Sequence, residues 1–179
     1  MIYLFLAEGF EEIEALTPVD ILRRAGKEIL TVGIGGKSIK GAHGIEVLAD
    51  LDECALLDEN PEMIILPGGM PGTLHLEASA TVQSAIDRAT TSGAFIAAIC
   101  AAPTILGKRG LLEGKQATCY PSMEADLKGA MLSDKAVVRD GNIITAAGMG
   151  VALPFALTLV EVLCGEQTAQ NLKESVVMR

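Results

Sequence analysis

The fold of this chain is decided by one continuous run, Phe95-Ile96-Ala97-Ala98-Ile99-Cys100-Ala101-Ala102-Pro103. Its first five residues are uniformly apolar, which is typical of a strand buried on both faces of a parallel sheet. Small residues follow the cysteine, and the proline favours the first turn of a helix. The run therefore predicts a sharp strand-to-helix turn with Cys100 at its corner.

A cysteine at such a corner lies beside the free N–H groups of a helix N-terminus. These groups favour an anion, so they are expected to lower the pKa of the Cys100 thiol and make it a nucleophile. The alternative is a buried structural cysteine, which is the common state of a free thiol in proteins. We favour the reactive interpretation because the strand–cysteine–helix pattern surrounds this residue.

The rest of the chain alternates between strand and helix patterns. Pro18 lies inside the first helical pattern and predicts a kink or two abutting helices there. We expect one three-layer α/β domain over residues 1–179, with a mostly parallel sheet. The clearest strand patterns cover 2–7, 28–34, 63–66, 95–99 and 143–145, and the clearest helix patterns cover 11–25, 79–92 and the segment after 150.

Composition excludes several classes of protein. The 179-residue chain has a net charge of −9 and no basic cluster, which argues against a nucleic-acid surface. Its 4 cysteines form no CxxC pair and no secretory signal precedes them, so they are interpreted as reduced cytosolic thiols. The apolar run 94–106 is too short to cross a membrane. We expect a cytoplasmic protein with neither a nucleic-acid nor a membrane partner.

Two glycines follow another buried strand, within Pro67-Gly68-Gly69. The carboxyl ends of parallel strands meet at one edge of a sheet, so these glycines are expected near Cys100. Their backbone N–H groups, with that of Ala101, would form an oxyanion site for a substrate oxygen. The alternative is an ordinary turn after a strand.

The first strand is followed by an acidic segment that is expected at the same edge. Glu11 and Glu14 are three residues apart and share one helix face. A carboxyl in a partly buried pocket keeps its proton to a higher pH and can then donate a hydrogen bond to a thiolate. The alternative is a solvated helix N-terminus, which we expect for at least two of the nearby glutamates.

Histidine is scarce in this chain. His43 and His75 fall in predicted loops, where surface positions are expected, and no histidine follows residue 75. There is no Cys/His cluster with the spacing of a metal site and no glycine-rich nucleotide-binding loop. We therefore expect neither a metal nor a cofactor.

The segments 7–14, 66–69 and 97–103 together resemble the signatures of the ThiJ/PfpI superfamily. The similarity extends over nearly the whole chain and is greatest to the branch of the Parkinsonism-associated protein (DJ-one-like). The resemblance implies a flavodoxin-like three-layer sandwich, similar to class I glutamine amidotransferases, and a homodimer. It also implies that Cys100 is a reactive cysteine in a strained backbone conformation.

The resemblance assigns further site residues. Glu14 matches the buried acid beside the sulfur, and Glu11 matches a nearby polar position; Gly69 and Ala101 match the oxyanion donors. One departure is Tyr120, which stands where the family has a histidine before proline. A phenol is a poor base near neutral pH, so Tyr120 is expected to donate a hydrogen bond or act as a slow general acid.

The family resemblance also bears on His43. It stands where some relatives present a residue from the partner subunit. We take it as a hypothesis that His43 supplies the missing imidazole across a dimer interface.

Two functions remain open. In the first, Cys100 performs cofactor-free glyoxalase- or deglycase-like chemistry on a small 2-oxoaldehyde, a carbonyl substrate. In the second, the protein is a non-enzymatic redox sensor or chaperone-like stress-response protein, in which an oxidant converts Cys100 to a sulfinate. A peptidase is disfavoured because Ala101 stands where that branch has histidine, and an amidotransferase would require a downstream histidine.

Overall fold

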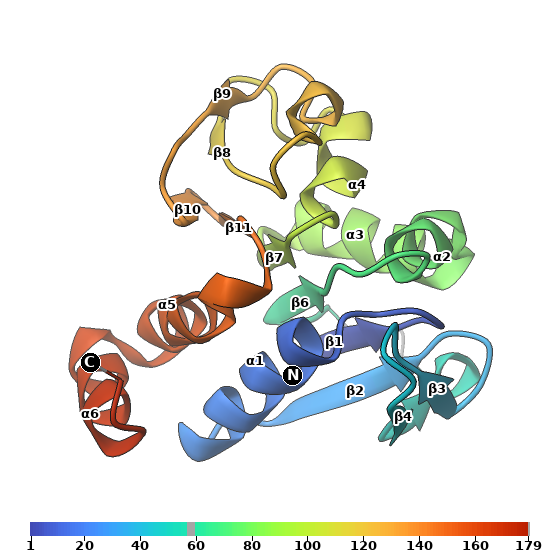
Figure 1. The fold of residues 1–179 in the computed structure, drawn as a ribbon, viewed down its shortest axis with the longest axis horizontal. Coiled ribbons are helices and arrows are strands. Elements are labelled where there is room, and N and C mark those ends of the chain that lie inside the picture. Colours follow the sequence, from blue (N-terminus) through green and yellow to red (C-terminus); the bar gives the residue numbers. More distant parts are fainter. Residues whose placement is uncertain (57–59, 179) are drawn as a thin grey trace.

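A seven-stranded sheet forms the centre of the computed structural model, which describes residues 1–56 and 60–178 (Figure 1). The strand order is β10-β11-β7-β6-β1-β2-β5, and every neighbouring pair is parallel except β10 with β11. The strands are β1 (Ile2–Leu6), β2 (Ile29–Gly33), β5 (Leu51–Asp52), β6 (Met63–Leu66), β7 (Phe95–Ile99), β10 (Val137–Asp140) and β11 (Ile143–Ala146).

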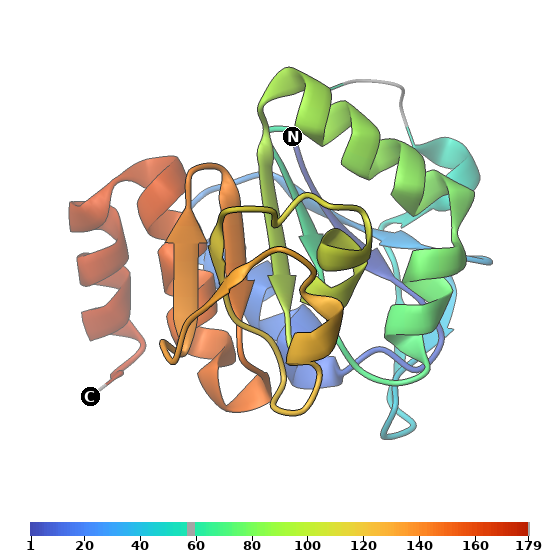
Figure 2. The ribbon, with the colours of Figure 1, turned by 90° about the horizontal axis from the view of Figure 1, so that it is seen from above.

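Helices cover both faces of this sheet. The α-helices are α1 (Glu12–Arg24), α2 (Gly72–Ala78), α3 (Ala80–Ser92), α4 (Pro103–Lys108), α5 (Ala152–Cys164) and α6 (Glu166–Ser175). Helices α1 and α5 lie on one face, and α3 and α4 on the other (Figure 1). Seen from above, α6 lies at the edge of the molecule beside α5 (Figure 2). This is the three-layer sandwich with a mostly parallel sheet that the sequence predicts.

The apolar run of β1 shows why the strands carry hydrophobic residues without alternation. Leu4 and Leu6 belong to the core beneath α1 and α5, whereas Tyr3 and Phe5 belong to the core beneath α3 and α4. Successive side chains point to opposite faces of a strand, so both sets must be apolar when both faces are covered. The carboxyl ends of the central strands therefore lie at one edge of the sheet. The packed cores on the two faces fix the position of that edge.

Two small sheets lie outside the main one. Strands β3 (Ser38–Lys40) and β4 (Glu46–Leu48) form an antiparallel hairpin, and β8 (Gln116–Ala117) pairs with β9 (Met131–Leu132) in parallel. Three short 3₁₀ turns complete the regular structure of the described residues, at Glu53–Ala55, Glu124–Asp126 and Met149–Val151. The tip of the β3–β4 hairpin returns to the start of α1, where the N–H groups of His43 and Ile45 donate to Glu12.

Some sequence expectations differ from the structure. Pro18 does not divide the first helix in two, because α1 is continuous from Glu12 to Arg24 and the proline removes just one of its backbone hydrogen bonds. His75 lies in α2 rather than in a loop. The sequence also predicts a short helix at 122–128, where the structure has only the 3₁₀ turn Glu124–Asp126. None of the described helices is long and apolar enough to cross a membrane.

Candidate active site

Cys100 lies immediately after β7, at the corner the sequence predicts. Its φ is +64°, a left-handed conformation that costs energy for any residue other than glycine. Two main-chain hydrogen bonds hold the strained residue. The Cys100 N–H donates to the Ala146 carbonyl at 2.9 Å, and the Cys100 carbonyl accepts from the Tyr120 N–H at 2.8 Å. The neighbouring strand and the segment after β8 therefore fix the direction of the thiol.

Helix α1 brings Glu14 to this corner from the other end of the chain. Glu14 is 1% exposed, and its Oε2 accepts the Gly68 N–H at 2.9 Å. Its Oε1 is buried and has no hydrogen-bond partner among the described residues. A β-carbon on Gly68 would lie 2.6 Å from Glu14 Oε2 and 2.7 Å from Cys100 Cβ, so only glycine fits between them.

Burial decides the charge of this carboxyl. Loss of hydration raises the pKa of Glu14 to about 7, and the nearby Glu11 charge adds to the rise, while the Cys100 thiol and the N–H groups of Gly68 and Met149 oppose it. Glu14 thus changes protonation near neutral pH rather than in the acidic range of an exposed glutamate. A carboxyl with this property can both accept and donate a proton at neutral pH.

The sequence-based prediction of a lowered thiol pKa is wrong. Burial raises the pKa of Cys100 to about 12, the Glu14 carboxylate adds to the rise, and the N–H groups of Ala101 and Gly69 oppose it. Protonation of Glu14 removes the repulsion and makes the carboxyl a donor to sulfur. The two groups therefore titrate as a coupled pair that shares a proton.

The N–H groups expected to form an oxyanion site differ in their availability. Those of Gly69 and Ala101 face the Cys100 sulfur. The Gly68 N–H is already donated to Glu14, so it is not free for a substrate oxygen. Gly69 has a φ of +91° and approaches the main chain of residues 9–11 too closely for a β-carbon. The available donors are therefore Gly69 and Ala101.

The opposite side of the sulfur is less tightly packed. A β-carbon on Gly148 would lie 4.0 Å from Cys100 Sγ and 3.5 Å from Tyr120 Cδ2, so Tyr120 borders the space beside the thiol. The Tyr120 side chain is 51% exposed, and its hydroxyl has no hydrogen-bond partner in the described part of the chain. Cys119 points away: it is buried in the core beneath α3 and α4.

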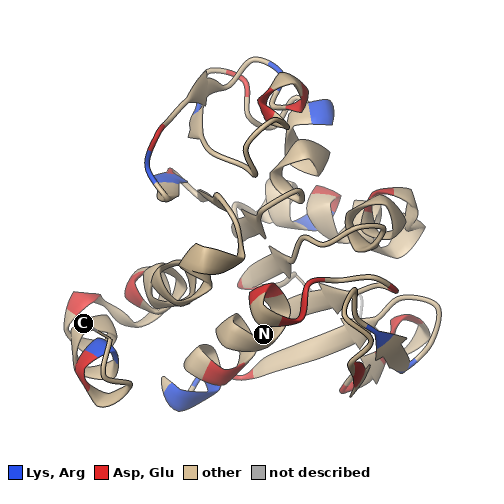
Figure 3. Cartoon of the chain, viewed as in Figure 1, with Lys and Arg blue, Asp and Glu red and all other residues tan. Residues whose placement is uncertain are grey.

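The acidic start of α1 is not a solvated helix N-terminus, contrary to expectation. Acidic residues gather on the loop before α1 and on its first turn (Figure 3). Glu12 and Glu14 are buried, and the Glu11 side chain is only 12% exposed. Glu8 alone among these glutamates is exposed. This segment supplies buried carboxylates rather than a charged surface.

His43 meets two of these carboxylates within the same chain. Its Nδ1 lies 3.0 Å from Glu12 Oε2 and 3.4 Å from Glu11 Oε2. The hydrogen bond to Glu12, with the charges of Glu11 and Glu12, raises the pKa of His43. Burial acts to raise the pKa of Glu12, but its hydrogen bonds, first of all that from His43, outweigh burial and lower it.

Sequence reasoning missed the grouping of Glu11, Glu12 and His43, whose potential ligand atoms lie within 4.8 Å of one another. The sequence feature that relates to this grouping is Gly41, because a β-carbon there would overlap the Glu12 carboxylate. Glu12 is already occupied by the His43 ring and by the N–H groups of His43 and Ile45. The group is accordingly an internal ion pair.

The chain is similar to proteins of one family over most of its length. The model of the DJ-1/PfpI family matches residues 1–162. The chain is 37% identical to dj-1beta of Drosophila melanogaster over 176 residues, covering 97% of this chain and 94% of that protein. The crystal structure of Drosophila DJ-1beta has a TM-score of 0.94 at 35% identity, covering 99% of this chain and 97% of that one.

Two further relatives carry informative descriptions. A Caenorhabditis elegans protein, named glutathione-independent glyoxalase DJR-1.2, is 32% identical over 92% of this chain and 89% of its own length. A structure described as oxidized Toxoplasma gondii DJ-1 has a TM-score of 0.94 at 32% identity, covering 98% of this chain and 97% of that one. These descriptions apply to the relatives themselves.

Proposed function

The chain belongs to the DJ-1/PfpI family, and from this premise we propose that it is a cofactor-free glyoxalase-like enzyme acting on small 2-oxoaldehydes. One observation carries the proposal: the strained Cys100 lies against a buried carboxyl, Glu14, whose pKa is raised to about 7. A nucleophile and a group that exchanges protons at neutral pH are the two components such a reaction needs.

In the first step the Cys100 sulfur attacks the aldehyde carbon of a substrate such as methylglyoxal. A carbon–sulfur bond forms, the carbonyl π electrons move to oxygen, and the thiol proton passes to the Glu14 carboxylate. The N–H groups of Gly69 and Ala101 stabilise the developing oxyanion, which takes that proton back from Glu14. The products of this step are a hemithioacetal and the Glu14 carboxylate.

In the second step Glu14 moves a proton between the two carbons of the substrate. The carboxylate removes the proton from the carbon bonded to sulfur and returns it to the adjacent carbon of the resulting enediolate. The hydroxyl proton of the first carbon moves to the oxygen of the second, so a thioester of a 2-hydroxy acid results. The first carbon is oxidised and the second reduced, so no external electron carrier is required. Water then attacks the thioester, and lactate leaves with recovery of the Cys100 thiol.

The C. elegans relative supports this assignment through its name, at 32% identity. The departure at Tyr120 bears on the hydrolysis step, because a phenol is a poor base at neutral pH. We therefore expect slow turnover, with water attack on the thioester as the slow step.

The test is lactate formation from methylglyoxal by the purified protein in an amine-free buffer. We expect Cys100→Ala to abolish turnover, while Cys54→Ala, at an exposed cysteine outside the site, retains it. Equal lactate production by the Cys100→Ala variant would reject the proposal.

A redox sensor is the second candidate, and the unpaired Glu14 Oε1 favours it. A protonated Glu14 would donate to a sulfinate oxygen on Cys100, and this role requires no base at residue 120. Peroxide would oxidise the thiolate to a sulfenate and then a sulfinate, each step releasing water or hydroxide. Mass spectrometry after mild peroxide treatment would show oxygen added at Cys100 first. Equal oxidation of all 4 cysteines would exclude it.

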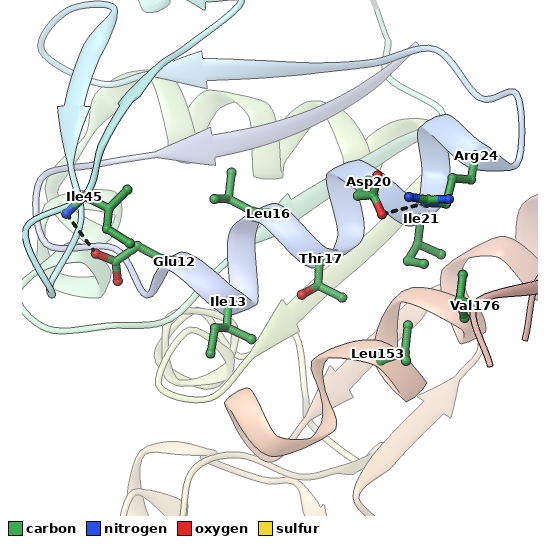
Figure 4. Close-up of a pocket in the computed structure, with 10 residues that line it drawn as sticks. All are labelled: Glu12, Ile13, Leu16, Thr17, Asp20, Ile21, Arg24, Ile45, Leu153 and Val176. Atoms are coloured by element: carbon green, nitrogen blue, oxygen red, sulfur yellow. Dashed lines mark hydrogen bonds and ion pairs between the residues drawn. The ribbon is translucent and has the colours of Figure 1, made fainter. Parts of the chain in front are cut away.

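We also propose that a second copy of the chain covers the outer face of α1. A groove of about 740 Å³ runs along this helix (Figure 4). Ile13, Leu16 and Ile45 line it with apolar side chains that are exposed in a single chain. A two-fold axis would place one such row against its copy, as the family resemblance leads us to expect.

The oligomeric state tests this proposal directly. Leu16→Glu introduces a charge at the centre of the exposed row, and we expect it to convert a dimer into a monomer in sedimentation velocity. A single-chain mass for the unmodified protein at micromolar concentration would contradict the proposal.

A further inference from the structure

His43 is a titratable group whose role the proposed chemistry leaves unassigned. It lies at the tip of the β3–β4 hairpin, and its side chain is 68% exposed. Its Nδ1 nevertheless points inward, 3.0 Å from Glu12 Oε2 and 3.4 Å from Glu11 Oε2. A hollow of about 250 Å³ beside the ring is lined by these residues, by Ile13 and Ile45, and by Met149, whose N–H faces Glu14. The ring is therefore near the active site without entering it.

Glu12 holds the hairpin tip in this position. Its Oε1 accepts the His43 N–H at 2.9 Å and the Ile45 N–H at 3.4 Å, while Oε2 meets the ring. Gly41 leaves room for the carboxylate to approach the loop. If the tip turned away, this 6% exposed carboxylate would lose the groups that compensate its burial. The position of the imidazole is thus built into the fold.

Glu11 connects the imidazole to the buried acid. Its own N–H donates to the Gly68 carbonyl at 3.0 Å, and the N–H of the same Gly68 donates to Glu14 at 2.9 Å. Glu11 and Glu14 are also three residues apart at the start of α1, where side chains are neighbours. A negative charge on Glu11 therefore disfavours a second negative charge on Glu14.

We propose that His43 is a positioning residue of the Cys100 site, which sets through the charge of Glu11 how readily Glu14 releases its proton. The inference rests on the proposed function in taking Cys100 as the reactive thiol. It places the action of His43 within its own chain and requires no partner subunit. Its consequence is a link between an imidazole at the hairpin tip and a buried proton-transfer pair.

The direction of the effect follows from the charges. A protonated His43 offsets the Glu11 charge, so Glu14 ionises more readily; a neutral His43 leaves Glu11 uncompensated, so Glu14 keeps its proton to higher pH. Among the described residues, the charged groups around the ring are Glu11 and Glu12 from the start of α1. Lys40 from β3 is also near, because its side chain lies beside Gly44, the next residue after His43.

The test is the pH dependence of Cys100 alkylation by iodoacetamide, followed by peptide mass spectrometry. His43→Asn keeps a hydrogen-bond donor near the Nδ1 position but cannot become a cation. We expect it to move the inflection due to Glu14 upward by about half a pH unit. Glu11→Gln should move the same inflection downward. His43→Lys, which restores a cation, should return it toward the unmodified profile.

The double variant separates a relay through Glu11 from any other effect. If Glu11 carries the influence, adding His43→Asn to Glu11→Gln leaves the inflection where Glu11→Gln alone places it. An equal shift by His43→Asn in both backgrounds would overturn the inference, as would an unchanged profile in the single variant. Methylglyoxal turnover is measured separately, so an inactive protein whose alkylation profile shifts as expected refutes the proposed enzyme and retains the coupling.

Discussion

The two sides of the Cys100 sulfur differ in how tightly they are built. On the Glu14 side, the Gly68 peptide fills the space between the carboxyl and the cysteine, and no β-carbon would fit. On the Tyr120 side, a β-carbon on Gly148 would meet only ordinary contacts of 3.5 Å or more. Proton transfer requires fixed distances, whereas a substrate requires room. The difference fits the proposed function, in which proton transfer uses the tightly packed side and substrate enters from the looser one.

The largest effect that this comparison predicts comes from adding one methyl group to the buried side. Gly68→Ala would force Glu14 and Cys100 apart, so we expect a loss of about 3 kcal/mol of unfolding free energy and about 100-fold in turnover. Urea unfolding and methylglyoxal turnover would measure the two losses.

Gly148→Ala is the matched control because it adds the same group on the looser side. Its φ of 164° is extended backbone that alanine adopts readily, so stability should change by less than about 0.5 kcal/mol. Equal destabilisation by the two substitutions would refute the distinction between the two sides.

Glu14→Gln tests the buried carboxyl through the pH dependence of stability. Folding raises the pKa of Glu14 from 4.5 to about 7, so the folded protein binds a proton more tightly than the unfolded chain. Stability is then greatest below pH 4.5 and falls as pH rises through the window up to about 7, by about 3 kcal/mol from this group. Glutamine does not titrate, so the variant should lack this component.

Urea unfolding at several pH values between 4 and 8 would measure it. Glu8→Gln is a suitable control, because Glu8 is exposed and belongs to the same acidic segment. Parallel stability curves for the unmodified protein and Glu14→Gln would show that this carboxyl titrates normally in the folded state.

Whether a feature of the site can be predicted from the sequence depends on whether neighbouring or distant residues in the chain determine it. The corner at Cys100 is evident from residues 95–103 because a buried strand and a helix start are local patterns. The contact of His43 with Glu12 joins residues 31 apart, and it depends on how a short hairpin folds back onto α1. No local sequence pattern indicates that contact. The sequence therefore predicts a surface position for His43, with a role across a dimer interface as a separate hypothesis, and does not predict its contact with Glu12.

The sign of the thiol pKa was missed for a related reason. Sequence reveals the helix start whose N–H groups favour an anion, but it does not reveal how deeply the sulfur is buried or whether its acidic neighbour is ionised. Those two quantities dominate here and act in the opposite direction. The fold class was predictable because continuous apolar strands require cover on both faces, a requirement that does not depend on any single contact.

The smallest expected effect belongs to the looser side, at Tyr120. The hydroxyl of this half-exposed residue has no hydrogen bond to lose among the described residues, so Tyr120→Phe should change stability by less than about 0.5 kcal/mol. Its main-chain N–H, which holds the Cys100 carbonyl at 2.8 Å, is kept. The rate of Cys100 alkylation should therefore remain within about twofold. A large fall in that rate would mean that the phenol itself contacts the sulfur, and both sides of the cysteine would then take part in proton transfer.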